Sequence, residues 1–149
     1  MSTRHRGIDN SLCEIFGDRR DLGRMGERLT NFFSMALSYH DYGESIEQTY
    51  HTFFLGAVWT LRYECKSNRE AGFGRYDIAM KAHDFCAVIE FKTALSQSDD
   101  DLNKAVNDAL AQIDELEYWQ EFSGSDLPVY KIGVACFKKE CLVKVVKHG

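Results

Sequence analysis

The segment Ala87-Val88-Ile89-Glu90-Phe91-Lys92 decides the fold, because it places two charged residues in an otherwise apolar run. A run this rich in apolar residues is typical of a strand that is covered on both faces. Glu90 and Lys92 are two residues apart, so they project from the same face of that strand. Charges are costly to bury there unless they are paired or bind a cation. The segment therefore predicts a central strand that carries a site, with a structural salt bridge as the alternative.

A second carboxylate belongs to the preceding predicted strand, where Asp77 lies between the apolar residues Tyr76 and Ile78. If the short turn at His83-Asp84 joins the two strands, Asp77 comes close to Glu90. Two neighbouring carboxylates repel each other unless a proton or a cation lies between them. Mg²⁺ prefers hard oxygen ligands, keeps several waters and is commonly held by one or two carboxylates. The pair therefore predicts a site for Mg²⁺, or for Mn²⁺ in its place.

Regular patterns on either side predict the other elements in the order helix, helix, three strands, helix, two strands. Apolar residues recur at helical spacing from Met25 and again from about Ser45. A serine cap with early acids starts a third helix at Ser98, which runs to about Phe122. Strand patterns cover residues 63–67, 76–81, 85–93, 129–137 and 141–147. We expect an α/β fold with a central mixed sheet flanked by helices, plus an N-terminal helix.

The length of 149 residues, with 44% hydrophobic content, is enough for one sizeable core and too short for two ordinary domains. Residues 1–24 mix charge with glycine and predict an N-terminal arm, and residues 25–149 form the single domain. The five cysteines, an odd number, lie mostly in apolar runs and suit a reducing cytoplasm. No run of about 18 apolar residues occurs, so neither secretion nor membrane insertion is expected.

A formal net charge of −5 argues against a broad basic surface for nucleic acid. Any contact with nucleic acid must therefore be local. Lys66, Arg69 and Arg75 lie near the turn that leads to Asp77 and are the candidates for phosphate contacts. Ordinary solvated charges are the alternative for each of them.

Five stretches carry a resemblance to a known family: Glu47-Gln48-Thr49-Tyr50-His51, residues 67–77 (SNREAGFGRYD), Ile89-Glu90-Phe91-Lys92, Ala109-Leu110-Ala111-Gln112-Ile113 and Lys131-Ile132-Gly133-Val134-Ala135. Over roughly residues 45–146 they resemble the PD-(D/E)XK nuclease superfamily, in the branch often found C-terminal to a domain similar to AAA ATPases. The resemblance implies a restriction-endonuclease-like core of α-β-β-β-α-β. The chain has no GxxxxGK[ST] phosphate loop, so it resembles a trimmed domain or a stand-alone relative.

By this resemblance, Asp77 and Glu90 are the metal-binding acids and the Phe91 carbonyl is a further ligand. Lys92 would orient or help to deprotonate the attacking water and offset charge on the phosphate. Hydrolysis of a phosphodiester needs a nucleophilic hydroxide near neutral pH and cations around the developing charge. A metal and a lysine together supply both.

The resemblance implies second-tier members on two helices. Glu47 would add a carboxylate to the metal site, directly or through a water. His51, one turn later, would contact nucleic acid or cap the site, and a solvated helix flank is the alternative for both residues. Gln112 would face the site from the third helix, with a role in packing as the alternative.

The resulting expectation is an Mg²⁺-dependent nuclease that hydrolyses phosphodiester bonds in locally bound DNA. Two rival interpretations stay open. One is a catalytically silent module of the same fold that works with an AAA-ATPase-like partner. The other is a structural interaction domain that docks through the helix carrying Phe32 and Phe33. The sequence also allows a homodimer.

Overall fold

A computed structural model describes residues 12–37, 46–60, 63–70, 75–115 and 126–148. The helices are α2 (Leu22–Leu37), α3 (Ile46–Thr60) and α4 (Asp99–Glu115). The strands are β1 (Glu64–Glu70), β2 (Arg75–Lys81), β3 (Cys86–Thr93), β4 (Val129–Phe137) and β5 (Glu140–Lys147). This is the predicted order of elements.

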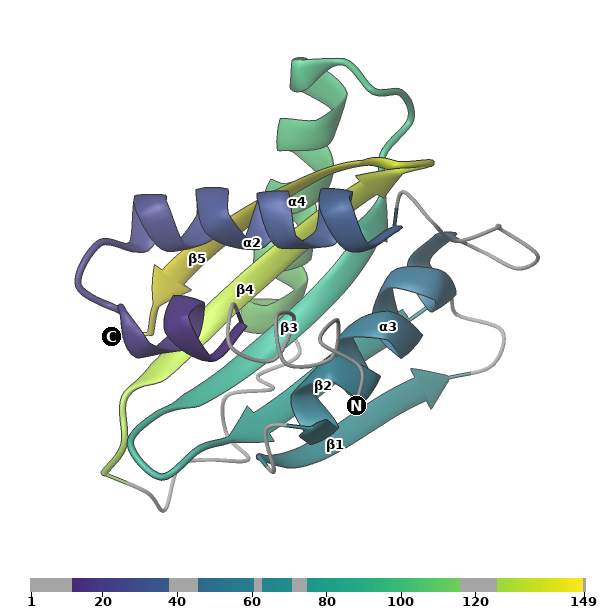
Figure 1. The fold of residues 1–149 in the computed structure, drawn as a ribbon. Helices are drawn as coiled ribbons and strands as arrows, with labels where there is room; N and C mark the ends of the chain where they lie inside the picture. The colour runs from purple at the N-terminus through teal and green to yellow at the C-terminus, as the bar shows by residue number, and fades with distance from the viewer. Residues whose placement is uncertain (1–11, 38–45, 61–62, 71–74, 116–125, 149) are drawn as a thin grey trace.

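The strands form one mixed sheet in the order β1-β2-β3-β4-β5, as Figure 1 shows. The β3–β4 pair is parallel, and the β1–β2, β2–β3 and β4–β5 pairs are antiparallel. A parallel pair needs a crossover connection, and α4 provides it. The predicted α/β class with a mixed sheet is confirmed, and β3 is the central strand that its apolar sequence indicated.

Helices cover both faces of the sheet (Figure 1). On one face α2 lies over β5, and α3 lies over β1, β2 and β3. The larger core lies there and contains the buried side chains of Phe33, Phe54, Ile89 and Phe91. On the other face α4 packs against β3 and β4 around a smaller core that includes Val106. The side chains of β3 alternate, so Cys86, Val88, Glu90 and Lys92 lie on the face covered by α4.

Some boundaries differ from the prediction. Helix α2 begins at Leu22, and residues 12–17 form a short helix of their own. Its side chains of Leu12, Ile15 and Phe16 are buried in the larger core, so this part of the predicted arm packs onto the domain. Strand β1 continues to Glu70 because its register with β2 runs to the pair Glu70–Arg75. The predicted extension of the third helix beyond residue 115 lies outside the described residues.

Within the described residues, every helix is too short or too polar to span a lipid bilayer.

Candidate metal centre on the sheet

The register of the sheet places Asp77 directly opposite Glu90 on neighbouring antiparallel strands. Residues in such a pair share one face of the sheet. Strand pairing thus establishes at the backbone level the juxtaposition that the sequence required. The side chain of Asp77 itself lies outside the described part of the structure.

Backbone hydrogen bonds of β3 show whether Asp77 and Glu90 form a hydrogen-bonded or a non-hydrogen-bonded pair. The Cys86 amide donates to the Pro128 carbonyl at 2.8 Å, and the Ala94 amide donates to the Cys136 carbonyl at 2.9 Å. The even-numbered residues of β3 therefore direct their backbone groups toward β4. Glu90 does the same, so Asp77–Glu90 is a pair without mutual backbone hydrogen bonds. In such pairs the Cα atoms are only about 4.5 Å apart and the side chains are closest.

The sheet divides at this pair. Among the described residues, the β2–β3 register ends at Asp77–Glu90, whereas β3 stays paired with β4 as far as Thr93. Phe91 is the next residue along β3, and by the same alternation its carbonyl is directed toward the β2 side, just beyond the last pair. A main-chain oxygen and two carboxylate positions therefore meet at this division of the sheet.

The two charges of β3 have different surroundings. The side chain of Glu90 is fully buried, with 0% exposure, under the face that α4 covers. Lys92 lies two residues further along the same face and is half-buried. A carboxylate buried this deeply needs a neighbouring cation or proton donors to remain charged. The arrangement suits a cation held inside the protein beside a half-buried lysine.

Helix α4 is tied to the sheet beside Glu90. Lys131 of β4 forms a 2.6 Å ion pair with Asp114 of α4, and only 12% of the lysine side chain is exposed. Lys144 of β5 donates a hydrogen bond to the Asn107 side chain at 3.4 Å. The register of the sheet places Gly133 of β4 between Glu90 on β3 and Lys144 on β5.

The structure places the second-tier candidates differently. Gln112 is half-buried on α4, the helix over the Glu90 face. His51 is 1% exposed on α3, and its ring meets that of Phe91 edge-on, with centroids 5.9 Å apart. Because Phe91 faces the larger core, this ring lies on the other side of the sheet from Glu90. Helix α3 turns His51 into the core, and its contact with nucleic acid stays a prediction. The side chain of Glu47 lies outside the described residues.

The candidates for phosphate contacts occupy two faces by register. Lys66 pairs with Ala79 and Glu70 pairs with Arg75, so Lys66 and Arg75 take positions on the Asp77 face. Arg69 pairs with Tyr76 and takes a position on the opposite face. Their side chains are not among those that the structure describes, so their contacts with nucleic acid stay a prediction.

The described residues contain no group of three or more His, Cys, Asp or Glu side chains that could hold a metal ion. The candidate centre differs from such a cluster, since it combines two carboxylate positions with a main-chain carbonyl. Those hard oxygen donors fit Mg²⁺ or Mn²⁺, which retain waters in the remaining positions. The chemistry of this donor set and the burial of Glu90 therefore fit the expected metal.

The cysteines do not offer a competing site. Burial raises the pKa of Cys65 to about 11, and burial also raises the pKa of Cys86 and Cys141. A thiol binds zinc as the thiolate, which a raised pKa disfavours near neutral pH. All five cysteines are free thiols, as their sequence context indicated.

Gly133 was not singled out as a site residue. A methyl group on it would lie 2.8 Å from the Val106 carbonyl oxygen of α4, so only glycine fits without a shift. The signal that could have revealed it is an isolated glycine inside an apolar strand, which often marks a close backbone approach.

Together, the mixed sheet with its parallel central pair and the helices on both of its faces define an α/β domain. Sequence comparison matches residues 45–146 to the PD-(D/E)XK nuclease superfamily. The chain belongs to this family. No curated protein and no solved structure matched the chain.

Proposed function

We propose that this protein is an Mg²⁺-dependent nuclease that hydrolyses phosphodiester bonds in DNA, with Asp77, Glu90 and Lys92 at its centre. The observation that carries the proposal is the Asp77–Glu90 register pair, which ends the β2–β3 ladder two residues before Lys92. Membership of a nuclease superfamily supports the same class of reaction.

Each residue has a defined task in this proposal. The carboxylates of Asp77 and Glu90, with the Phe91 carbonyl, would hold the metal. When bound, Mg²⁺ supplies a Lewis acid beside the phosphate and lowers the pKa of a water. Lys92 lies on the same face toward solvent, where its ammonium group offsets negative charge on the phosphate and orients the water. Helix α4 excludes bulk water from the Glu90 side, which strengthens these electrostatic interactions.

Further parts of the proposal concern the surroundings of the site. DNA is held locally through Lys66 and Arg75, whose register positions flank Asp77. An AAA-ATPase-like partner is proposed from the sequence resemblance, and Glu47 and Gln112 are proposed to support the centre from α3 and α4. The free cysteines fit a reducing cytoplasm.

The test measures cleavage of plasmid and single-stranded DNA with Mg²⁺ or Mn²⁺ by the wild type and by Lys92→Ala. We expect the variant to lose on the order of 10²–10³-fold in rate, as for other groups that stabilise transition-state charge. The matched control is Lys81→Ala, because Lys81 is an exposed lysine on the same face of the sheet, away from the centre.

A wild type that cleaves neither substrate with either metal contradicts the proposal. If the wild type cleaves DNA, equal cleavage by Lys92→Ala contradicts the assignment of the centre. Glu90→Gln separates metal binding from the role of the lysine, because it removes a ligand charge and leaves Lys92 in place.

A further inference from the structure

Helix α4 approaches the sheet closely at Gly133. A methyl group there would lie 2.8 Å from the Val106 carbonyl oxygen, 3.1 Å from Leu110 Cγ and 3.2 Å from Val106 Cγ2. The first of these contacts is to backbone, so a rotamer change cannot relieve it. A side chain at this position therefore requires a shift of the α4 backbone relative to β4.

This contact lies beside the candidate metal centre. Gly133 is the register partner of Glu90 in the parallel β3–β4 pair. The same row across the sheet continues through Asp77 on one side and Lys144 on the other. The distance between α4 and the sheet is therefore limited at Gly133, which lies in the same row of paired residues as Asp77 and Glu90.

The helix presents a defined side to this row. Asn107 and Asp114 are seven residues apart on one flank of α4. Asn107 binds Lys144 of β5, and Asp114 binds Lys131 of β4. At 3.6 residues per turn, Ala105 and Gln112 fall on the other flank, with Ala109 between that flank and the buried side. This flank lies toward β3, because β3 is on the other side of β4 from β5. The side of α4 nearest Glu90 is thus formed by small residues and Gln112.

We infer that Gly133 is a positioning residue of the metal centre: it holds α4 at the depth where this flank covers Glu90 and fixes the buried carboxylate. This inference rests on the proposed function. Residues outside the ligand shell that fix a ligand typically change metal affinity by about 10–100-fold when they are altered.

The experiment compares Gly133→Ala with Gly26→Ala. Gly26 lies in α2 on the opposite face, and a methyl group there would meet the Val143 carbonyl oxygen, also at 2.8 Å. Both variants therefore introduce the same overlap between a helix and a strand, on opposite faces of one sheet. Stability is measured by urea denaturation, and binding of Mn²⁺ alone is measured by the loss of its free-ion electron paramagnetic resonance signal.

We expect both variants to be less stable than the wild type. Only Gly133→Ala should also bind Mn²⁺ at least about 10-fold more weakly, with Gly26→Ala remaining at the wild-type affinity. Equal Mn²⁺ affinity in the two variants overturns the inference, because the glycine would then have only a structural role.

A second pair of variants covers the case in which Gly133→Ala does not fold. Asp114→Asn removes the ion pair with Lys131 that holds the same helix, and it adds no volume. Asp108→Asn alters an exposed acid of α4 by the same chemical change. Weaker Mn²⁺ binding in Asp114→Asn alone supports the inference, and equal binding in the two variants contradicts it.

The outcomes separate this inference from the proposed function. A wild type that binds no Mn²⁺ contradicts the metal centre and with it both statements. A wild type that binds Mn²⁺ and cleaves DNA, together with a Gly133→Ala variant of unchanged affinity, contradicts the positioning role alone.

Discussion

At the scale of single residues, Arg19 shows how one cation joins distant parts of the chain. Its guanidinium forms a 2.8 Å ion pair with Asp84 in the β2–β3 turn and donates a hydrogen bond to the Phe16 carbonyl. It also lies 4.4 Å from the centre of the Phe85 ring, within the range of a cation–π interaction. Through these contacts the segment before α2 is attached to the turn that precedes the central strand.

The ion pair leads to a prediction about pH. The hydrogen bond from Arg19 lowers the pKa of Asp84 below its ordinary value of 3.8. A lowered pKa means that the pair stabilises the fold above that value and that this contribution is lost as the pH falls through the folded pKa. Because Asp84 is largely exposed, Asp84→Asn should cost at most about 1 kcal/mol at pH 7.

The measurement for this prediction is urea denaturation of the wild type and Asp84→Asn at pH 7, 5 and 3. The difference should shrink as the pH falls below about 4. Asp108→Asn on the exposed side of α4 is the control. A difference that persists unchanged at pH 3 would show that the ion pair is not its source.

How far the site could be predicted also depends on individual residues. The shared face of Glu90 and Lys92 could be predicted from the sequence, because residues two apart in a strand project from the same face. The burial of His51 could not be predicted, because a helix that is apolar on several sides does not reveal from its sequence which side meets the sheet. Gly133 was missed because its role depends on the distance between β4 and a helix from another part of the chain.

At the scale of elements, the start of α4 is capped as its sequence predicted. The Asp101 amide donates to the Ser98 hydroxyl at 3.2 Å, and the Ser96 hydroxyl donates to the Asp101 carboxylate at 2.6 Å. Three aspartates occupy the first turn, where the helix dipole favours negative charge. The helix that covers the candidate centre therefore has its first turn fixed by local hydrogen bonds.

Replacing the cap should weaken the whole domain slightly. Ser98→Ala removes the acceptor for the Asp101 amide and should cost about 1 kcal/mol. Ser98→Asp keeps an acceptor at the same position and should retain most of the stability. Thermal denaturation of both variants tests this, and equal melting temperatures would show that the serine is not needed for capping.

Element order was readable from the sequence because the apolar period changes from helical to strand spacing at each boundary. The end of β1 was not readable, because residues 66–70 are polar and remain in the sheet only through pairing with β2. The short helix at residues 12–17 carried a signal of only one turn, with apolar residues spaced by three and one. Such a turn gains stability from the core that it joins, which a local pattern does not show.

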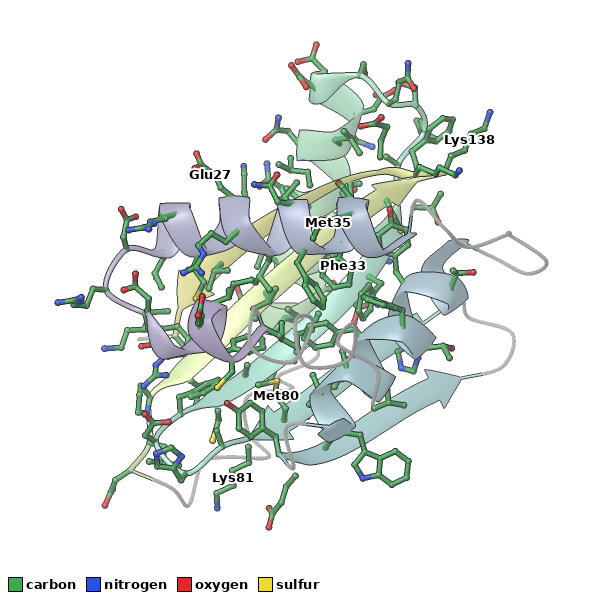
Figure 2. All side chains as sticks on the ribbon, viewed as in Figure 1. Glu27, Phe33, Met35, Met80, Lys81 and Lys138 are labelled. Carbon is green, nitrogen blue, oxygen red and sulfur yellow. The ribbon has the colours of Figure 1, made fainter. Side chains whose placement is uncertain are left out.

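At the scale of the whole molecule, aromatic rings connect the segments on the larger core. Phe16 stacks on Phe85 with centroids 5.6 Å apart and meets Phe54 and Tyr63 at 6.2 and 6.5 Å. One ring before α2 thus contacts α3, the residue before β1 and the turn before β3. Phe33 and Met80, both labelled in Figure 2, belong to the same core.

Phe16 is therefore a sensitive position for global stability. Phe16→Ala removes a fully buried ring and should cost about 3–5 kcal/mol, a large part of the stability of a typical domain. Its neighbour Cys13 is exposed, so Cys13→Ala is the matched control with little effect. Urea denaturation measures both variants, and a change below about 1 kcal/mol for Phe16→Ala would show that the segment does not belong to the core.

The division of the sheet at Asp77–Glu90 has a consequence for how the protein folds. Asp77, Glu90 and Lys92 all belong to one β-hairpin, a contact of short range that forms within microseconds. The cover over Glu90 depends on α4 and β4, which pair with β3 only after a much longer loop closes. We expect the acidic pair to be assembled early and in water, and docking of α4 to be the step that desolvates it. The slow, non-local part of folding would then be the part that covers the carboxylates of the candidate metal centre.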